Sequence, residues 1–313
     1  MLNVSLDAIE QAARVIDPAF LDTPEIELWP GLTLKLETLN PVRSFKGRGG
    51  DWLAARCGAG ETLVCASAGN LGQGLAHGAR RHGLELHVLA ARTANPAELR
   101  RLGELGARLT PVEGDADEAA ARAAALAAER GWRLVGAGAE PALAEGAATI
   151  AVELARRHGP ALRTVVVPVG NGSLACGVGT WLRAVSPGTR LVGVGSTASR
   201  ATHDAWCTGV AEPGPPFHTA APGLGVRVPE PDAVARLRQV VDEFVLVEED
   251  QLLDAAKLLW NNRGVLTEPS GAAAAAAVIQ RPDLAGEGVT ALVLTGANAS
   301  GDVLLRTLHG DPP

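Results

Sequence analysis

Lys46 lies in a glycine-rich segment, P-V-R-S-F-K-G-R-G-G, at residues 41–50. The chain has only three lysines, and arginine supplies the rest of its basic charge. Arginine keeps its proton and cannot act as an amine nucleophile, whereas lysine can once its pKa is lowered. Arg43 and Arg48 are close in sequence, and a neighbouring cation is one known means of lowering that pKa. The segment therefore indicates either a nucleophilic lysine or a solvated lysine in a flexible loop.

A second glycine-rich segment, A-S-A-G-N-L-G-Q-G at residues 66–74, follows a predicted strand and opens a predicted helix. Backbone N–H groups converge at such a helix start, so anions bind there. The side-chain amide of Asn70 can donate a hydrogen bond to a phenolate or carboxylate oxygen. An ordinary strand-to-helix turn is the alternative interpretation.

A third segment, P-V-G-N-G-S-L-A-C-G-V-G at residues 168–179, again joins a strand to a helix. Residues 170–173 can present successive N–H groups to a phosphate. The segment nearly matches the dinucleotide fingerprint, but that site needs an acidic residue about 20 positions further on. No Asp or Glu occurs between Leu154 and His203, and no Walker lysine is present. A phosphate group is therefore favoured over NAD or a hydrolysed nucleotide.

A fourth segment, L-T-G-A-N-A-S-G, occupies residues 294–301 after the last predicted strand. It places Thr295 at the carboxyl end of that strand, where open α/β sheets bind ligands. Threonine is also common within and at the ends of strands, so Thr295 alone carries little weight.

Strands and helices alternate along the chain, which has 313 residues. This pattern predicts an α/β fold with parallel sheets and helices on their faces. The predicted strands are 32–36, 62–65, 86–89, 108–111, 164–167, 191–194, 244–247 and 290–294. The predicted helices are 5–16, 51–56, 71–82, 96–105, 115–130, 141–158, 174–185, 249–262 and 271–280. The Pro- and Gly-rich loop at 211–231 is predicted either to flank the active site or to be a surface connection.

Composition excludes several classes of function. Aromatic residues make up 3% of the chain, tyrosine is absent and the net charge is −7, all of which disfavour a nucleic-acid or anionic-membrane partner. No secretory leader and no apolar run of membrane-spanning length is visible, so a cytoplasmic protein is expected. The cysteines lack C-x-x-C spacing and are predicted to be reduced packing residues. These are Cys57, Cys65, Cys176 and Cys207.

Taken together, the chain resembles the pyridoxal-phosphate enzymes of fold type II, which include threonine and serine dehydratases, serine racemase and cysteine synthase. The resemblance covers about residues 23–298. It is carried by five ordered motifs: L-K-L-E-T-L-N-P-V-R-S-F-K-G-R-G-G, A-S-A-G-N-L-G-Q-G, P-V-G-N-G-S-L, E-P-S-G-A-A-A and L-T-G-A-N. It implies two domains with the tryptophan synthase β-like fold, each an open, mostly parallel sheet flanked by helices. Residues 1–52 and 140–313 would form the large cofactor domain, and residues 53–139 a small mobile domain.

The same resemblance implies roles for individual residues. Lys46 would be the catalytic residue that joins the cofactor aldehyde as a Schiff base. The implied cofactor contacts are Phe45, Lys46, Asn70, Gly170, Asn171, Gly172, Ser173, Leu174, Gly223 and Thr295. The implied substrate contacts are Ser67, Ala68, Gly69 and Asn70.

Among these enzymes the chain most resembles the threonine/serine dehydratases. The implied activity is β-elimination of a hydroxy-amino acid to a 2-oxo acid and ammonia. Ala68 stands where serine racemases usually carry a second serine, so the resemblance argues against racemisation. Pro222 replaces the family's usual aspartate, so substrate preference can differ from the norm. The positions that match the family's divalent-metal ligands are Gly195 and Ala201, so no metal is expected there. One alternative is β-replacement, as in cysteine synthase, or another lyase or synthase reaction in secondary metabolism. A non-catalytic ligand-binding role is the other alternative, and a homodimer is expected.

Overall fold

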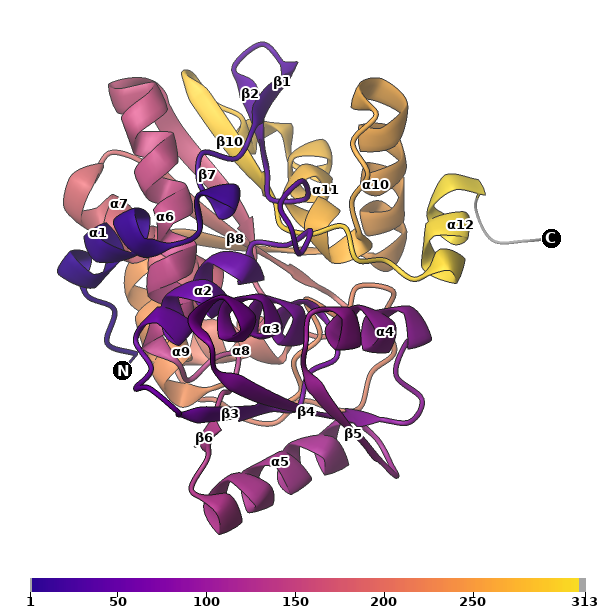
Figure 1. Cartoon of the computed structure of the whole chain (residues 1–313). Coiled ribbons are helices and arrows are strands. Elements are labelled where there is room, and N and C mark those ends of the chain that lie inside the picture. Colours follow the sequence, from indigo (N-terminus) through magenta and orange to yellow (C-terminus); the bar gives the residue numbers. More distant parts are fainter. Residues whose placement is uncertain (1, 310–313) are drawn as a thin grey trace.

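The computed structural model describes residues 2–309 and contains two sheets with helices packed around them (Figure 1). The larger sheet has six strands in the order β1-β2-β10-β7-β8-β9, and the β1–β2 pair is antiparallel while the other pairs are parallel. Its strands are β1 (Glu25–Trp29), β2 (Leu32–Leu36), β7 (Leu162–Pro168), β8 (Arg190–Ser196), β9 (Glu243–Val247) and β10 (Val289–Leu294).

The smaller sheet has four parallel strands in the order β5-β4-β3-β6. Its strands are β3 (Thr62–Cys65), β4 (Glu85–Ala91), β5 (Arg108–Val112) and β6 (Arg133–Leu134). The predicted α/β fold with two mostly parallel sheets is confirmed. The division into a large domain of residues 1–52 and 140–313 and a mobile domain of residues 53–139 stays a prediction. Residues 1 and 310–313 of that division lie outside the described residues.

Twelve α-helices surround the sheets within residues 2–309. They are α1 (Leu6–Val15), α2 (Lys46–Ala55), α3 (Asn70–His82), α4 (Pro96–Glu104), α5 (Ala116–Arg130), α6 (Pro141–His158), α7 (Ser173–Val185), α8 (Ala201–Thr208), α9 (Pro231–Val240), α10 (Glu249–Arg263), α11 (Ala273–Gln280) and α12 (Gly301–His309). In Figure 1, α5 covers one face of the smaller sheet, and α3 and α4 lie on the other. None of the helices in this described range combines the length and apolarity needed to cross a bilayer.

The central strands of the larger sheet are buried on both faces. Val165 and Val167 of β7 pack with α6, α7 and α9, whereas Val166 points to the opposite face and packs with α10 and α11. Such strands carry continuous apolar runs rather than alternating ones. The sheet therefore holds its carboxyl-terminal edge rigidly in place.

The helix that carries Lys46 is longer than the sequence predicted. A loop was expected up to Gly50, because glycine is a poor helix former, yet α2 begins at Lys46. Packing explains the difference: a Cβ added to Gly50 would lie 2.3 Å from the carbonyl carbon of Gly74, and one on Gly49 would lie 2.7 Å from the carbonyl oxygen of Leu143. The glycines allow α3 and α6 to approach α2 closely. The elements β1, β6, α8, α9 and α12 were also not predicted.

All four cysteines are free. Cys65 and Cys176 are buried, as expected for packing residues, and Cys57 is half-buried. Cys207 is exposed on α8, so the prediction that it is a packing residue is wrong.

Candidate active site

The structure brings the lysine segment against the third and fourth glycine-rich segments. Lys46 is the first residue of α2, and its Nζ donates a hydrogen bond to Ser173 Oγ at 3.1 Å. The N–H of Phe45 donates to the carbonyl oxygen of Thr295 at 3.0 Å. The lysine amine, the start of α7 and the carboxyl end of β10 therefore meet at one edge of the larger sheet, where α/β proteins bind ligands.

Burial lowers the pKa of Lys46 from its ordinary value to about 8. The amine lies 4.8 Å from the centroid of the Phe45 ring, which adds an apolar neighbour. The expectation that a nearby cation lowers this pKa is wrong, because Arg43 is exposed and Arg48 turns to carboxylates on the other side of α2. Burial alone therefore gives the Lys46 amine a substantial neutral fraction near physiological pH.

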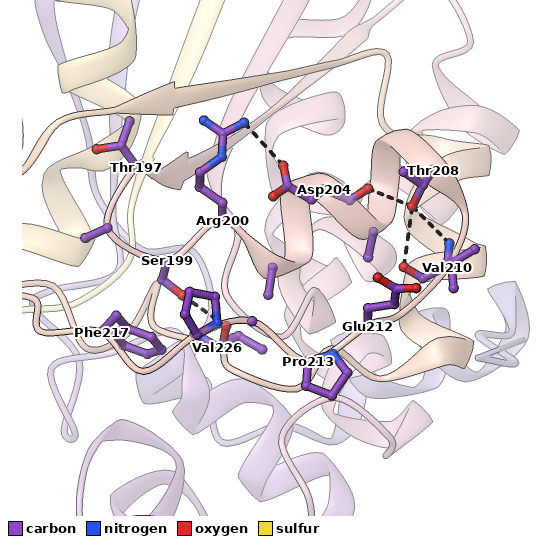
Figure 2. A pocket seen from close by; sticks show the side chains of 15 residues that line it. Thr197, Ser199, Arg200, Asp204, Thr208, Val210, Glu212, Pro213, Phe217 and Val226 are labelled. Carbon is purple, nitrogen blue, oxygen red and sulfur yellow. Dashed lines mark hydrogen bonds and ion pairs between the residues drawn. The ribbon is translucent and has the colours of Figure 1, made fainter.

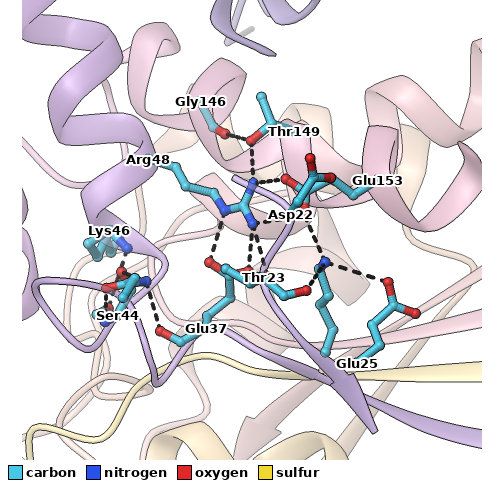
Figure 3. Close-up of polar contacts among 12 residues, drawn as sticks. Asp22, Thr23, Glu25, Glu37, Ser44, Lys46, Arg48, Gly146, Thr149 and Glu153 are labelled. Atoms are coloured by element: carbon cyan, nitrogen blue, oxygen red, sulfur yellow. Dashed lines mark hydrogen bonds and ion pairs between the residues drawn. The ribbon is translucent and has the colours of Figure 1, made fainter. Parts of the chain in front are cut away.

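Arg48 anchors the lysine helix through a buried ion network (Figure 3). Its guanidinium is fully buried and contacts Glu37 at 2.8 Å and Glu153 at 2.5 Å, with a further hydrogen bond to Thr149 Oγ1. Burial alone would lower the pKa of Arg48, but the two carboxylates outweigh burial and raise this pKa above its ordinary value. Lys35 joins the same network through Glu153 at 2.7 Å. These contacts tie α2 to β2 and α6 and so fix the origin of the Lys46 side chain.

The third segment forms an anion site at the start of α7. Gly172 is the N-cap residue with φ of +89°, a left-handed conformation suited to glycine, and it offers no side chain to cap the helix. The first N–H groups of α7 are therefore open to an anion, which the helix dipole also favours. Thr202 Oγ1 donates to the carbonyl oxygen of Gly170 at 3.1 Å, and a Cβ on Gly170 would lie 2.3 Å from the oxygen of Gly223. Contacts with Thr202 and with Gly223 therefore hold Gly170 in position.

The second segment runs from the end of β3 into α3. Gly69 is the N-cap residue of α3 and provides no capping side chain, and residues 66–70 are all half-buried. Asn70 Nδ2 donates to Glu268 Oε1 at 2.8 Å, while Asn70 Oδ1 accepts from Asn298 at 2.6 Å. Residues Ser67 to Asn70 thus lie beside the other segments, with open N–H groups suited to a substrate carboxylate.

Glu268 belongs to this site, although the sequence analysis gave it no role. Its buried carboxylate contacts Asn70 and accepts the N–H of Asn298 at 2.9 Å. Burial raises its pKa to about 7, with a smaller contribution from the nearby carboxylate of Glu98. The E-P-S-G motif was an available signal, because it places this glutamate immediately before the short helix Pro269–Ala272. Its coupling to Asn70, 198 positions away, depends on the fold.

The Pro- and Gly-rich loop at 211–231 also reaches the site. The N–H of Gly223 donates to Ser270 Oγ at 3.0 Å, and a Cβ on Gly223 would lie 2.9 Å from the same hydroxyl. Thr295 is buried at the end of β10. Every segment that the sequence singled out therefore contributes to one region, and the loop flanks it.

The donor set suits an aldehyde that carries a phosphate. A primary amine with a pKa of about 8 can form an imine. The uncapped start of α7 can hold a phosphate, and the Thr295 hydroxyl can face a ring nitrogen without protonating it. Lys46 and Ser173, which are hydrogen-bonded, place the amine next to the phosphate loop. These residues fit pyridoxal phosphate.

Comparison with known proteins supports this assignment. The family model described as pyridoxal-phosphate dependent enzyme matches residues 19–296. The chain belongs to this family. This pyridoxal-phosphate dependent enzyme is 32% identical over 244 residues to a mitochondrial threonine dehydratase of Saccharomyces cerevisiae. It is 31% identical over 269 residues to an L-threonine ammonia-lyase of Geobacter sulfurreducens, and 30% identical over 309 residues to a catabolic L-threonine dehydratase of Staphylococcus aureus strain N315.

These relatives differ in length. The matches cover 76%, 84% and 94% of this pyridoxal-phosphate enzyme, but 42% of the yeast protein, 66% of the Geobacter protein and 89% of the Staphylococcus protein. The chain therefore spans less than half of the yeast relative and about two thirds of the Geobacter relative.

Solved structures agree on the fold. A threonine deaminase from T.th. superposes with a TM-score of 0.86 at 29% identity, over 95% of this chain and 99% of that one. The processed form of threonine deaminase isoform 2 from Solanum lycopersicum superposes with a TM-score of 0.89 at 23% identity, over 99% and 96% of the two chains. Maize serine racemase gives a TM-score of 0.90 at 21% identity, over 98% and 97%. The last two similarities show the fold alone.

A separate cavity of about 400 Å³ lies beside α8 in this pyridoxal-phosphate enzyme (Figure 2). Arg200 and Asp204 line one wall at 3.3 Å from each other, and Phe217 and Val226 line another. Within residues 2–309 no group of three or more His, Cys, Asp or Glu side chains is arranged to hold a metal. That Gly195 and Ala201 leave the protein without a metal here stays a prediction.

Proposed function

We propose that this enzyme catalyses β-elimination of a hydroxy-amino acid such as L-threonine or L-serine to a 2-oxo acid and ammonia. The observation that carries the proposal is the Lys46 amine, whose pKa burial lowers to about 8 and whose Nζ lies 3.1 Å from Ser173 Oγ at the start of α7. The threonine dehydratase relatives at about 30% identity support the reaction class.

Pyridoxal phosphate, when bound, withdraws electrons from the α-carbon of an amino acid and so makes its α-hydrogen acidic. The chain supplies the rest. The neutral Lys46 amine removes that hydrogen as a general base. The N–H groups at residues 67–70 bind and orient the α-carboxylate, and the start of α7 holds the phosphate. Glu268 accepts a hydrogen bond from Asn70 Nδ2 at 2.8 Å, and its pKa of about 7 allows it to hold or release a proton near neutral pH.

Elimination requires a base on one face of the substrate only. Lys46 provides one, whereas Ala68, at the position where serine racemases usually carry a second serine, has no hydroxyl to transfer a proton. This asymmetry favours elimination over racemisation.

The direct test uses purified protein loaded with pyridoxal phosphate and offered L-serine and L-threonine. Formation of pyruvate or 2-oxobutyrate with equimolar ammonia supports the proposal, and Lys46→Ala is the matched control. A protein that shows the visible absorbance of bound cofactor but releases no 2-oxo acid from either amino acid contradicts it. Addition of a thiol such as hydrogen sulfide tests the replacement reaction, because cysteine would then accumulate in place of pyruvate.

A further inference from the structure

Helix α8 (Ala201–Thr208) carries three side chains in a relay that the proposed reaction does not use. His203 Nδ1 lies 2.9 Å from Asp204 Oδ1, and His203 Nε2 lies 3.7 Å from Cys207 Sγ. The spacing of four residues places His203 and Cys207 on one side of the helix. Cys207 is exposed, and the order of the contacts is carboxylate, imidazole, thiol.

The order of these contacts sets the roles of the groups. Asp204 accepts the Nδ1 proton of His203, which leaves Nε2 as an acceptor that faces the thiol. The ring is also held by Phe244, whose centroid is 5.4 Å away. Arg200 contacts the same carboxylate at 3.3 Å (Figure 2). Burial raises the pKa of Asp204, but hydrogen bonds from His203 and Arg200 outweigh burial and lower this pKa. The carboxylate therefore stays charged.

The other three cysteines have surroundings that differ from those of Cys207. Burial raises the pKa of Cys65 and of Cys176 to about 12. Burial, assisted by Glu61, also raises the pKa of Cys57, whose Sγ bonds the carbonyl oxygen of Leu53. Cys207 is the one exposed cysteine of the four, and it is the one that a histidine faces.

We propose that Cys207 is a nucleophilic thiol, activated by His203 and Asp204, and a site of covalent modification by soft electrophiles, hydroperoxides among them. His203 Nε2 takes the thiol proton as sulfur attacks. With a hydroperoxide, an S–O bond forms and the O–O bond breaks; sulfur is oxidised to a sulfenic acid, and the leaving oxygen takes the imidazolium proton as water or an alcohol. With an alkyl iodide, an S–C bond forms and iodide leaves.

The position of the thiol gives modification a route to the active site. Thr202, on the same helix, donates to the carbonyl oxygen of Gly170 in the phosphate loop. A group added at Cys207 would therefore lie on a helix that contacts the phosphate loop.

Alkylation kinetics of the cofactor-loaded enzyme test the proposal. Iodoacetamide is added at pH 7, and peptide mass mapping follows each cysteine with time. We expect Cys207 to be labelled first and Cys65 and Cys176 to stay unlabelled. His203→Gln should lower the rate constant at Cys207 about tenfold by removing the base, while His158→Gln, on α6, leaves it unchanged.

A second measurement does not depend on any variant. In the wild-type enzyme at pH 7, the alkylation rate constant at Cys207 should exceed the rate constant at the half-buried Cys57. Equal alkylation rates at Cys207 in wild type and His203→Gln would overturn the assignment, and so would faster labelling of Cys57 than of Cys207. Hydrogen peroxide followed by a dimedone trap then shows whether the sulfenic acid forms at this residue.

Discussion

Lys46 and Arg48 are two residues apart on α2, yet their surroundings are opposite. Arg48 is fully buried and bonds Glu37, Glu153 and Thr149, so its charge is compensated on every side. The side-chain amine of Lys46 donates to the Ser173 hydroxyl, and burial lowers the pKa of the amine to about 8. A paired charge fixes the helix, and an unpaired one at the same helix start becomes reactive.

The largest effect on the enzyme is expected from substitution of Lys46, the residue without a charged partner. Lys46→Ala removes the base and the imine-forming amine, so turnover of serine or threonine should fall by about 10³-fold or more. Lys46→Arg should be equally inactive, because guanidinium does not release its proton. Both variants should keep the thermal unfolding midpoint within a few degrees of wild type. Release of 2-oxo acid measures the first claim, and a variant that retains a tenth of the activity would remove Lys46 from its role.

The next effect concerns the paired member. Arg48→Met leaves Glu37 buried without its cation and Glu153 with Lys35 alone, and it should lower the free energy of unfolding by about 3–5 kcal/mol. Arg14→Met removes an exposed pair with Glu10 and should cost at most about 1 kcal/mol. Urea denaturation followed by circular dichroism compares the two. Equal losses in both variants would show that the buried network does not anchor α2.

Glu268 extends the comparison to an unpaired acid. Its pKa is about 7 in the folded enzyme, against about 4.3 for an exposed glutamate. The stability that the protonated Glu268 side chain contributes is present at pH 4 and is lost as pH rises through 7. The reason is that the unfolded chain releases this proton at a lower pH than the folded protein does. Relative to Glu268→Gln, wild-type cofactor-free protein should lose on the order of 2–4 kcal/mol between pH 4 and pH 8. Glu104→Gln, an exposed control, should follow wild type; a Glu268→Gln curve parallel to wild type would refute the shift.

The smallest effect is expected from the hydrogen bond that the Lys46 side-chain amine donates to Ser173. Ser173→Ala removes that partner and a hydroxyl from the phosphate site, so pyridoxal phosphate should dissociate about fivefold more readily, the equivalent of about 1 kcal/mol. Ser186→Ala, at the other end of α7, is the control. Equilibrium dialysis of the cofactor measures both, and unchanged affinity in Ser173→Ala would place its hydroxyl outside the binding site.

The sequence predicted the sheets and the segments around Lys46, Asn70, Gly170 and Thr295, because glycine-rich turns after apolar strands carry a strong local signal. It failed at the start of α2, where the glycines that weaken a helix in isolation allow two other helices to pack against it. It also failed at α8 and α9, which border a loop rich in Pro and Gly.

The electrostatics of the site were the least predictable part. The arginines near Lys46 in sequence suggested repulsion, while the fold directs Arg48 away and buries the lysine instead. The raised pKa of Glu268 depends on burial and on Glu98, a residue of α4. Both effects are set by which elements pack together, and local sequence does not contain that information.

The crossing of α2 and α3 has a practical consequence for engineering. Gly50 and Gly74 each lie one turn beyond a site residue, Lys46 and Asn70, and a Cβ on Gly74 would lie 2.4 Å from the carbonyl oxygen of Lys46. Libraries that aim to widen substrate range should leave Gly50 and Gly74 unchanged, because a methyl group at either position would force α2 and α3 apart and displace both Lys46 and Asn70.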